Sequence, residues 1–191
     1  IYTADYYYVK FFDSDNGVIV CGYAKSNDTN ESSRIYSTSN GGESWDIVGS
    51  GPATNIIKGV VYVSSDVGFF CYDYVEGMDS NLYKTDDGGK TFAKVMLEEQ
   101  ELDSSAANPQ GQETETKTDS GKNGADSSEQ LRWGDVYKEA LTPVVDSTGI
   151  ITIYLTQGKN AVYNDGKTAA KYQSSDKGST WKYIGQVEIK D

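Results

Sequence analysis

Short runs of apolar and aromatic residues alternate with turn-forming residues along the chain, and this pattern predicts three units of four strands each. The clearest turn is Asp15-Asn16-Gly17, because Asn and Gly tolerate the positive φ angles that a tight hairpin requires. Segments 66–68 and 146–149 occupy the same place in the later units. We therefore expect an all-β protein. The expected strands are 6–13, 18–24, 34–37 and 45–48, then 56–63, 69–75, 82–85 and 92–96, then 136–145, 150–156, 169–174 and 181–187.

An eight-residue motif, which we call the box, recurs between the third and fourth expected strands of each unit. A hydroxyl residue comes first, an Asp or Asn third, a Gly fifth and an aromatic residue last. Because the same unit is written three times, the chain is predicted to be a repeat protein. The three copies are Thr38-Ser39-Asn40-Gly41-Gly42-Glu43-Ser44-Trp45, Thr85-Asp86-Asp87-Gly88-Gly89-Lys90-Thr91-Phe92 and Ser174-Ser175-Asp176-Lys177-Gly178-Ser179-Thr180-Trp181.

Each position of the box has an expected structural role, and none is expected to be catalytic. The third residue closes the turn by accepting hydrogen bonds from backbone N–H groups; these residues are Asn40, Asp87 and Asp176. The fifth residue adopts a backbone conformation that a Cβ would obstruct; these residues are Gly42, Gly89 and Gly178. The last residue buries its ring under the hairpin; these residues are Trp45, Phe92 and Trp181.

The box resembles the Asp-box, or sialidase-type, repeat of β-propellers in all three copies. The resemblance implies a partial β-propeller of three four-stranded blades. Closed propellers typically have four to eight blades, so further blades, from a longer chain or by association, are expected partners. The resemblance is specific for architecture, because the family includes enzymes, receptors and scaffolds.

Composition and charge divide the chain and exclude several functions. Residues 98–130 hold nine acids and two lysines with few apolar residues, so we expect a disordered acidic insertion between blades one and two, 1–97, and blade three, 131–191. The formal net charge of −12 argues against nucleic-acid binding, and no apolar run is long enough to insert into a membrane. The chain begins at Ile1 without a basic, apolar leader, which indicates a mature or excised piece.

Histidine is absent, which excludes His-based triads and imidazole metal sites within this chain. We expect no cofactor and no metal, and we interpret segment 13–17 as a turn rather than a calcium loop. Cys21 and Cys71 are interpreted as free strand thiols, although the sequence leaves a disulfide open.

The candidate site is the segment 131–140, which we expect to be an innermost strand that lines a central channel. Arg132, Trp133 and Tyr137 are the expected ligand contacts, and Asp135, Tyr137 and Glu139 are the candidate catalytic groups. The alternative is a solvated strand whose Trp133 and Tyr137 pack against the neighbouring blade. The polar loop 157–167 is either a second functional segment or a simple excursion.

The resemblance to sialidases implies a clamp of three arginines, but this chain contains only Arg34 and Arg132. We therefore predict a non-catalytic recognition or scaffold module that binds glycan, located outside the cell or on a bacterial surface. One alternative is a fragment of an exo-sialidase or other glycoside hydrolase that contributes Asp135, Tyr137 or Glu139. A further alternative is a protein-docking propeller of the assembly-factor type.

Overall fold

The computed structural model describes residues 4–23, 33–102, 132–158 and 163–189. The expected acidic insertion lies outside these residues except for 98–102, and loop 157–167 is described only in part. Strands dominate the described residues, and helix is confined to α1 (Trp133–Val136) and the 3-10 turn η2 (Tyr163–Gly166). The prediction of an all-β protein is thus confirmed.

The first two units form four-stranded antiparallel sheets, with the strands in chain order. Their ends differ from the predicted ones by a few residues, and the fourth strand of the second sheet is only two residues long. The first sheet consists of β1 (Tyr6–Phe11), β2 (Gly17–Gly22), β3 (Ser33–Thr38) and β4 (Asp46–Ser50). The second consists of β5 (Ile57–Tyr62), β6 (Gly68–Tyr72), β7 (Leu82–Thr85) and β8 (Ala93–Lys94).

The third sheet is also antiparallel, but its first strand is interrupted. Two short strands, β9 (Glu139–Ala140) and β10 (Val144–Val145), pair with opposite ends of β11 (Ile151–Thr156). β12 (Thr168–Ser174) and β13 (Lys182–Glu188) complete the sheet. The predicted continuous strand 136–145 is therefore wrong. Its beginning belongs to α1, and Pro143 between the two short strands has no N–H group to donate to the ladder.

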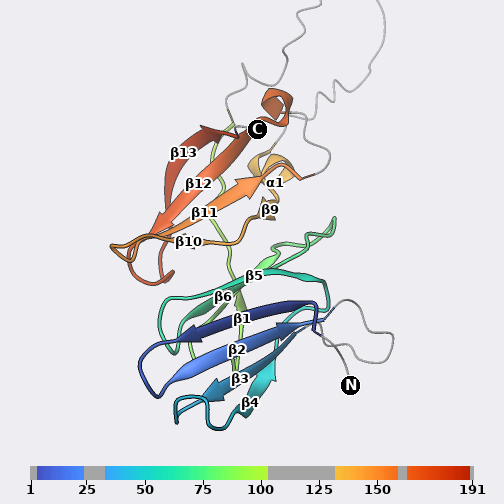
Figure 1. Cartoon of the computed structure of the whole chain (residues 1–191). Coiled ribbons are helices and arrows are strands. Elements are labelled where there is room, and N and C mark those ends of the chain that lie inside the picture. The colour runs from blue at the N-terminus through green and yellow to red at the C-terminus, as the bar shows by residue number, and fades with distance from the viewer. Residues whose placement is uncertain (1–3, 24–32, 103–131, 159–162, 190–191) are drawn as a thin grey trace, which may run out of the picture.

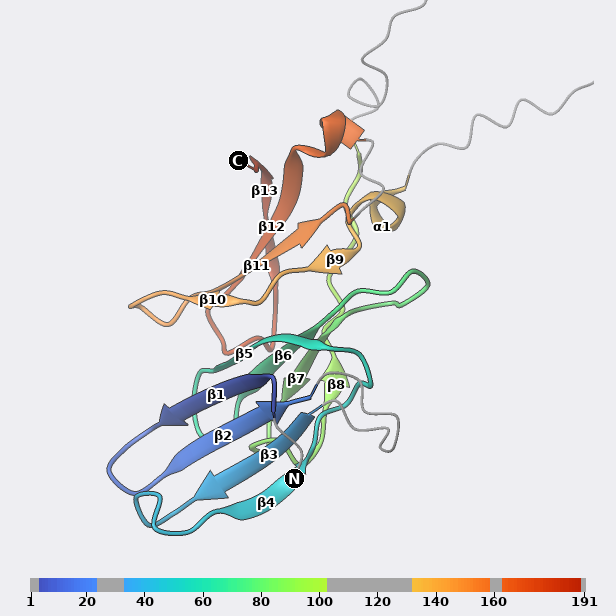
Figure 2. The same ribbon diagram turned by 45° about the vertical axis from the view of Figure 1, so that its right-hand side comes forward.

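The three sheets stack in chain order as an open, elongated body (Figures 1 and 2). One apolar cluster joins the first and second sheets and includes Val20 and Phe70. A second cluster joins the second and third sheets and includes Phe69 and Ile153. Because side chains alternate along a strand, the neighbours Phe69 and Phe70 of β6 point into different clusters. Both faces of the second sheet are therefore buried, and all five residues of β6 are buried.

The third box shows how the turn between the third and fourth strands is closed. Asp176 Oδ1 accepts the N–H groups of Ser179 and Thr180 at 3.1 and 2.9 Å, and Oδ2 accepts the Thr180 hydroxyl at 2.6 Å. The Ser174 hydroxyl donates to Asp176 at 2.7 Å and accepts the Gly178 N–H at 2.8 Å. One carboxylate and one hydroxyl thus satisfy the backbone donors of the turn.

The other two boxes form the same turn. Asp87 accepts the N–H groups of Lys90 and Thr91 at 2.9 and 2.8 Å. Asn40 accepts the Ser44 N–H at 3.0 Å, and its amide also donates to the Ser44 hydroxyl at 2.9 Å. The fifth residues have φ angles of 90°, 106° and 76°, in the region that favours glycine; these residues are Gly42, Gly89 and Gly178.

The box aromatics are less buried than we predicted. Trp45, Phe92 and Trp181 are all half-buried. Phe92 packs edge-on against Phe70, with ring centroids 4.9 Å apart, and Trp181 packs against Phe69 of the neighbouring sheet at 6.0 Å. Each ring therefore packs against one aromatic neighbour at a sheet face and does not lie at the centre of a core.

Cys21 and Cys71 are both free thiols. The register pairs Gly17 with Thr38 and Gly68 with Thr85, so the two strands superimpose at these glycines. Cys21 lies four residues after its glycine and Cys71 three, and this offset of one residue turns the thiols to opposite sheet faces. Burial raises the pKa of the Cys71 thiol to about 12.

Candidate functional site

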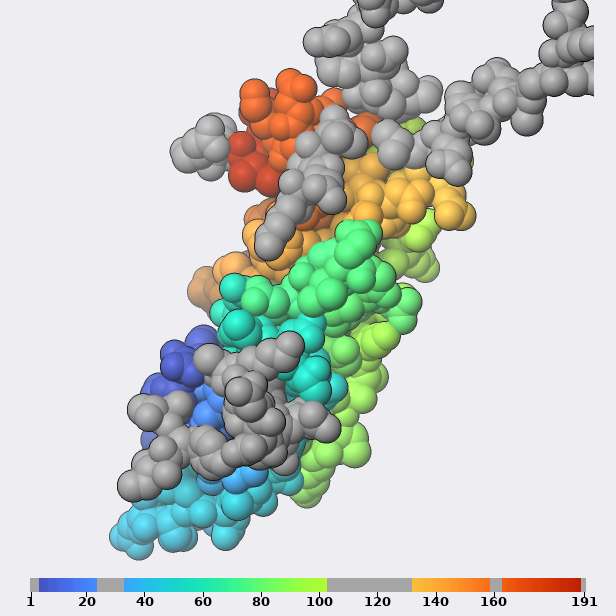
Figure 3. Space-filling model, turned by 90° about the vertical axis from the view of Figure 1, so that its right-hand side faces the viewer, coloured from blue at the N-terminus to red at the C-terminus, as the bar shows by residue number. Residues whose placement is uncertain are grey.

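A cleft of about 360 Å³ lies between the second and third sheets. Its lining comes from the loop between β6 and β7, from residues 95–99 after β8, and from the segment 132–140 that opens the third unit. The space-filling view shows the green β6–β7 loop against the orange start of the third unit (Figure 3). Since the box follows the other end of β7, the cleft and the box of the second sheet lie at opposite ends of that strand.

The segment that we expected to be an innermost strand begins with a helical turn. The Tyr137 N–H donates to Trp133 O at 2.9 Å and closes α1. Trp133, Val136 and Tyr137 are buried, and a spacing of three and four residues places them on one side of the turn. The predicted strand is wrong here because this apolar spacing has the period of a helix rather than that of a strand.

Trp133 and Tyr137, two of the expected ligand contacts, lie in the core of the third unit, each only 3% exposed. The Trp133 ring packs against Tyr137 at 4.6 Å and against Tyr183 at 5.3 Å, and the Tyr137 hydroxyl lies 2.9 Å from that of Thr168. The indole Nε1–H has no acceptor in hydrogen-bond geometry among the described residues, although the Tyr172 hydroxyl is close to it. Trp133 therefore borders the cleft without presenting an open ring face.

Charged side chains at the rim form pairs across and along the cleft. Arg132, which precedes α1 as its N-cap residue, has its Nε 3.5 Å from Oδ2 of Asp135 in α1, and both side chains are largely exposed. Lys138 Nζ lies 2.8 Å from Glu76 Oε1, which joins the third unit to the β6–β7 loop. This ion pair raises the pKa of Lys138. The rim thus carries cations that are already partly neutralised.

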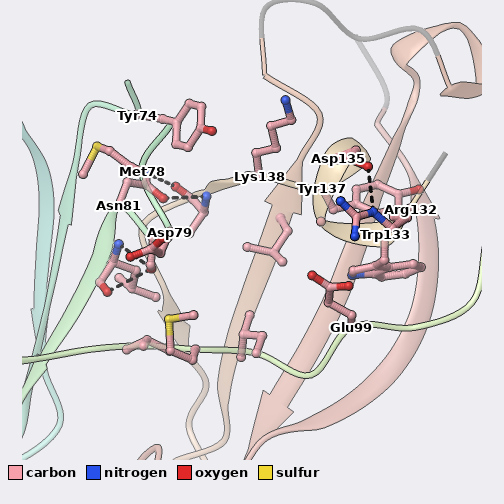
Figure 4. Close-up of a pocket in the computed structure, with 18 residues that line it drawn as sticks. Tyr74, Met78, Asp79, Asn81, Glu99, Arg132, Trp133, Asp135, Tyr137 and Lys138 are labelled. Atoms are coloured by element: carbon pink, nitrogen blue, oxygen red, sulfur yellow. Dashed lines mark hydrogen bonds and ion pairs between the residues drawn. The ribbon is translucent and has the colours of Figure 1, made fainter. Parts of the chain in front are cut away.

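Two further carboxylates line the cleft on opposite sides (Figure 4). Asp79 accepts a hydrogen bond from Lys94 Nζ at 2.7 Å, and this contact lowers the pKa of Asp79. Glu99 lies beside Gly134, where an added Cβ would be 2.5 Å from Glu99 Oε1. Gly134 thus allows the carboxylate to lie against α1.

The structure gathers four of the five predicted site residues at the cleft and leaves out the fifth. Arg132, Trp133, Asp135 and Tyr137 line it, whereas Glu139 does not. Glu139 lies in β9, with its carboxylate near Gly158. Their roles in binding or catalysis remain predictions.

Sequence reasoning missed Tyr74, Asp79, Glu99 and Lys138, which also line the cleft. Tyr74 is the half-exposed aromatic of this set, and Figure 4 shows its ring across from α1, near Lys138. No pattern within the loop or within residues 95–99 marks these positions. They become neighbours of α1 only because the second and third sheets stack.

No family model matches the chain, and no curated protein matches it in sequence. Among solved structures, the chain is similar to the Niastella koreensis GH74 enzyme, with a TM-score of 0.43 and 17% sequence identity. The match covers 88% of this chain and 19% of that enzyme, so the chain spans less than one fifth of its length.

No helix in ranges 4–23, 33–102, 132–158 and 163–189 has the length and apolar character to cross a membrane. The same ranges contain no group of three or more Cys, Asp or Glu side chains arranged to hold a metal ion.

Proposed function

We propose that the chain is a non-catalytic recognition module that binds a glycan in the cleft between its second and third sheets. The observation that supports this most directly is the lining of the cleft, where the half-exposed Tyr74 ring lies across from the charged side chains of α1. The volume of about 360 Å³ falls at the lower end of the range of small-molecule sites.

The chemistry of the lining suits a ligand rich in hydroxyl groups. Carboxylates accept hydrogen bonds from hydroxyls, and Arg132 and Lys138 donate to them. Tyr74 adds a ring that packs against an apolar sugar face and a hydroxyl that bonds to its edge. Asp79, Glu99 and Asp135 supply the acceptors.

A catalytic role is disfavoured by the state of the carboxylates. Glycoside hydrolysis needs one carboxyl whose pKa is raised so that it donates a proton to the leaving group. Lys94 instead lowers the pKa of Asp79, and Asp135 is exposed and paired with Arg132. The chain also has only two arginines, too few for the clamp of a sialidase.

We assign the three stacked sheets to the Asp-box class of β-propellers, on the recurrence of one turn closed by Asn40, Asp87 and Asp176. A glycan-binding module of this class acts outside the cell or at a bacterial surface, where glycans are displayed.

Binding is tested by NMR titration of the isotope-labelled full chain with a neutral β-glucan oligosaccharide, an oligomer of N-acetylglucosamine and sialyllactose. We expect at least one probe to bind and to shift the resonances of Tyr74 and Lys138. The Tyr74→Ala variant should lower the affinity roughly tenfold, which corresponds to about 1.4 kcal/mol.

The matched control is Tyr7→Ala, because Tyr7 is 61% exposed on the first sheet, away from the cleft. It should leave the affinity unchanged. If no probe binds at millimolar concentration, or if both tyrosine variants weaken binding equally, the cleft is not a glycan site.

A further inference from the structure

The first sheet carries a row of exposed apolar side chains on the face that points away from the second sheet. Tyr7, Val9 and Phe11 alternate along β1 and are 61%, 56% and 45% exposed, and Ile47 of β4 is 65% exposed. Directly paired residues lie on the same face of a sheet. Across the four strands, Val9 pairs with Ile19, Ile19 with Tyr36 and Tyr36 with Ile47, so these side chains share one face. We call it the free face of the first sheet. Large exposed apolar patches of this kind mark interaction surfaces.

The register shows which face this is. In the first sheet, Gly17 pairs with Phe11 on one side and with Thr38, the first box residue, on the other. In the second sheet, Gly68 pairs in the same way with Tyr62 and with the first box residue Thr85. These pairs align the two sheets residue by residue. By this correspondence, the free-face residues Val9, Phe11 and Ile19 are the counterparts of three residues of the second sheet. Those counterparts, Val60, Tyr62 and Phe70, pack onto the first sheet in the cluster that joins the two sheets. The free face therefore corresponds to a face that is already used for docking within the chain.

Hydrogen bonds at the sheet edge follow the same correspondence. The Tyr6 and Tyr8 hydroxyls of the first sheet accept the N–H groups of Val60 and Tyr62 at 3.0 and 3.1 Å. Between the second and third sheets, Asn81 Oδ1 accepts the Ala140 N–H at 2.8 Å. At both interfaces, the preceding sheet supplies a side-chain acceptor to the first strand of the following sheet.

In β1 the corresponding donors are the N–H groups of Val9 and Phe11. The hydrogen bond from Phe12 N–H to Asn16 O shows which residues of β1 bond to β2. The bond from Val63 N–H to Val67 O is its counterpart in the second sheet. Because the bonds of an antiparallel pair alternate, the N–H groups of Val9 and Phe11 point away from β2. They are oriented to meet acceptors from a preceding sheet.

The opposite end of the stack has a different character. Thr152 pairs with Gln173 and Tyr154 with Lys171 on the outer face of the third sheet, and the Gln173 amide donates to the Thr152 hydroxyl at 3.1 Å. Apart from Val144, which pairs with Thr152, this face is mainly polar and resembles the outer face of a terminal repeat. If the third sheet of a second copy docked on the free face, Lys171 would lie against apolar side chains. This disfavours self-association.

We propose that the free face of the first sheet docks a further four-stranded Asp-box sheet that is not among the three described here. Its first strand would present hydroxyl side chains to the N–H groups of Val9 and Phe11, as Tyr6 and Tyr8 do for the second sheet. Its docking face would carry apolar residues at the positions of Val18 and Val20, which contact the second sheet within this chain.

The probe is a second copy of residues 4–50 attached ahead of the full chain by a flexible linker, because that copy carries Tyr6, Tyr8, Val18 and Val20. We expect the extended chain to unfold at a higher temperature than the original chain. We also expect amide hydrogen exchange at Val9 and Phe11 of the original first sheet to slow about tenfold or more, as measured by NMR.

Two sets of variants make the test specific. Ile47→Lys in the original first sheet should remove the protection, whereas Ile184→Lys, an equally drastic change at an exposed position of β13, should preserve it. Replacing Tyr6 and Tyr8 by Phe in the attached copy alone should weaken the protection of Val9 and Phe11 while the rings still pack.

The proposal is wrong if exchange at Val9 and Phe11 is the same with and without the attached copy, or if the copy stays unfolded beside the free face. It is also wrong if the original chain sediments as a dimer that Ile47→Lys dissociates, since a second copy is then the occupant. These outcomes are independent of the glycan cleft, which lies at the other interface.

Discussion

The Asp176 and Asp87 carboxylates are held by backbone and hydroxyl donors of their own turns, and this fixes their charge state. Hydrogen bonds from Thr180 and Thr91 are the main cause that lowers the pKa of each carboxyl below its usual value. Asn40 forms the same turn with a neutral side chain. The same turn is thus closed by an ionised side chain in two boxes and by a neutral side chain in the first.

The double substitution Asp87→Asn and Asp176→Asn should therefore preserve the fold and reduce the loss of stability in acid. A carboxyl whose folded pKa is lowered stabilises the fold above its unfolded pKa, near 3.8, and loses this contribution as the pH falls through the folded value. Urea unfolding between pH 2 and pH 6 would measure it.

The difference from the unsubstituted chain should be largest above about pH 4 and should shrink toward pH 2. Asp13 and Asp146 also have lowered pKa values, so some acid dependence should remain. Parallel stability curves for the two proteins across this range would contradict the assignment.

Lys177 is the residue at which the third box departs from the other two. It has φ of 58°, whereas the corresponding Gly41 and Gly88 have 70° and 77°. A left-handed backbone costs a residue with a Cβ more than it costs glycine, because the Cβ approaches the following carbonyl oxygen.

Lys177→Gly should therefore raise the free energy of unfolding by about 1 kcal/mol, measured by thermal or chemical denaturation. The reciprocal variant Gly88→Lys should lower it by about 1–2 kcal/mol. If the two variants change stability in the same direction, backbone conformation does not govern this position.

At the scale of elements, Asn81 attaches the interrupted first strand of the third sheet to the second sheet. Its side chain is 1% exposed, and its amide donates to Ala140 O at 2.9 Å and to Tyr72 O at 2.8 Å. Its carbonyl oxygen accepts the Ala140 N–H at 2.8 Å. One buried amide thus replaces hydrogen bonds that a longer strand would make.

Asn81→Leu should destabilise the chain by about 2–4 kcal/mol, because it removes three hydrogen bonds from buried backbone groups of Ala140 and Tyr72. The control is Asn55→Leu, since Asn55 is only half-buried and bonds to the single backbone acceptor Asp73 O. It should cost about 1 kcal/mol or less. Similar losses for the two variants would show that Asn81 does not anchor β9.

At the scale of the whole molecule, stacking creates both the cleft and the free face. The cleft combines residues 74–81 with residues 132–138, which are distant in the sequence. The free face is exposed because the first sheet has a described neighbour on only one side. The proposed recognition sites therefore depend on the arrangement of sheets rather than on any single unit.

The chain is expected to show no turnover of a sialoside reporter. Two arginines cannot form a three-arginine clamp, and each missing charged hydrogen bond removes roughly 1.5–3 kcal/mol of binding. The measurement is release of the reporter over hours at pH 4 to 8. Hydrolysis that disappears in Asp135→Asn or Glu99→Gln would instead establish a glycoside hydrolase.

The sequence alone was sufficient for features whose cause is local. The three box turns, the Asn16-Gly17 hairpin and most strand positions depend on residues within a few positions of one another, and side chains such as Asp176 bond to the backbone of their own turn.

Tertiary structure decided what depends on contacts between residues far apart in the sequence. The helical turn at Trp133 and the burial of its ring depend on packing within the third unit, against residues such as Tyr183 of β13. The proximity of Tyr74 to α1 arises because the second and third sheets stack. The helical spacing of Trp133, Val136 and Tyr137 is too short to identify a helix from the sequence alone, and the packing surface of the third unit selects the helical turn. The exposure of Val9 and Phe11 has the same origin, because a strand pattern identifies an apolar face but not the sheet that covers it.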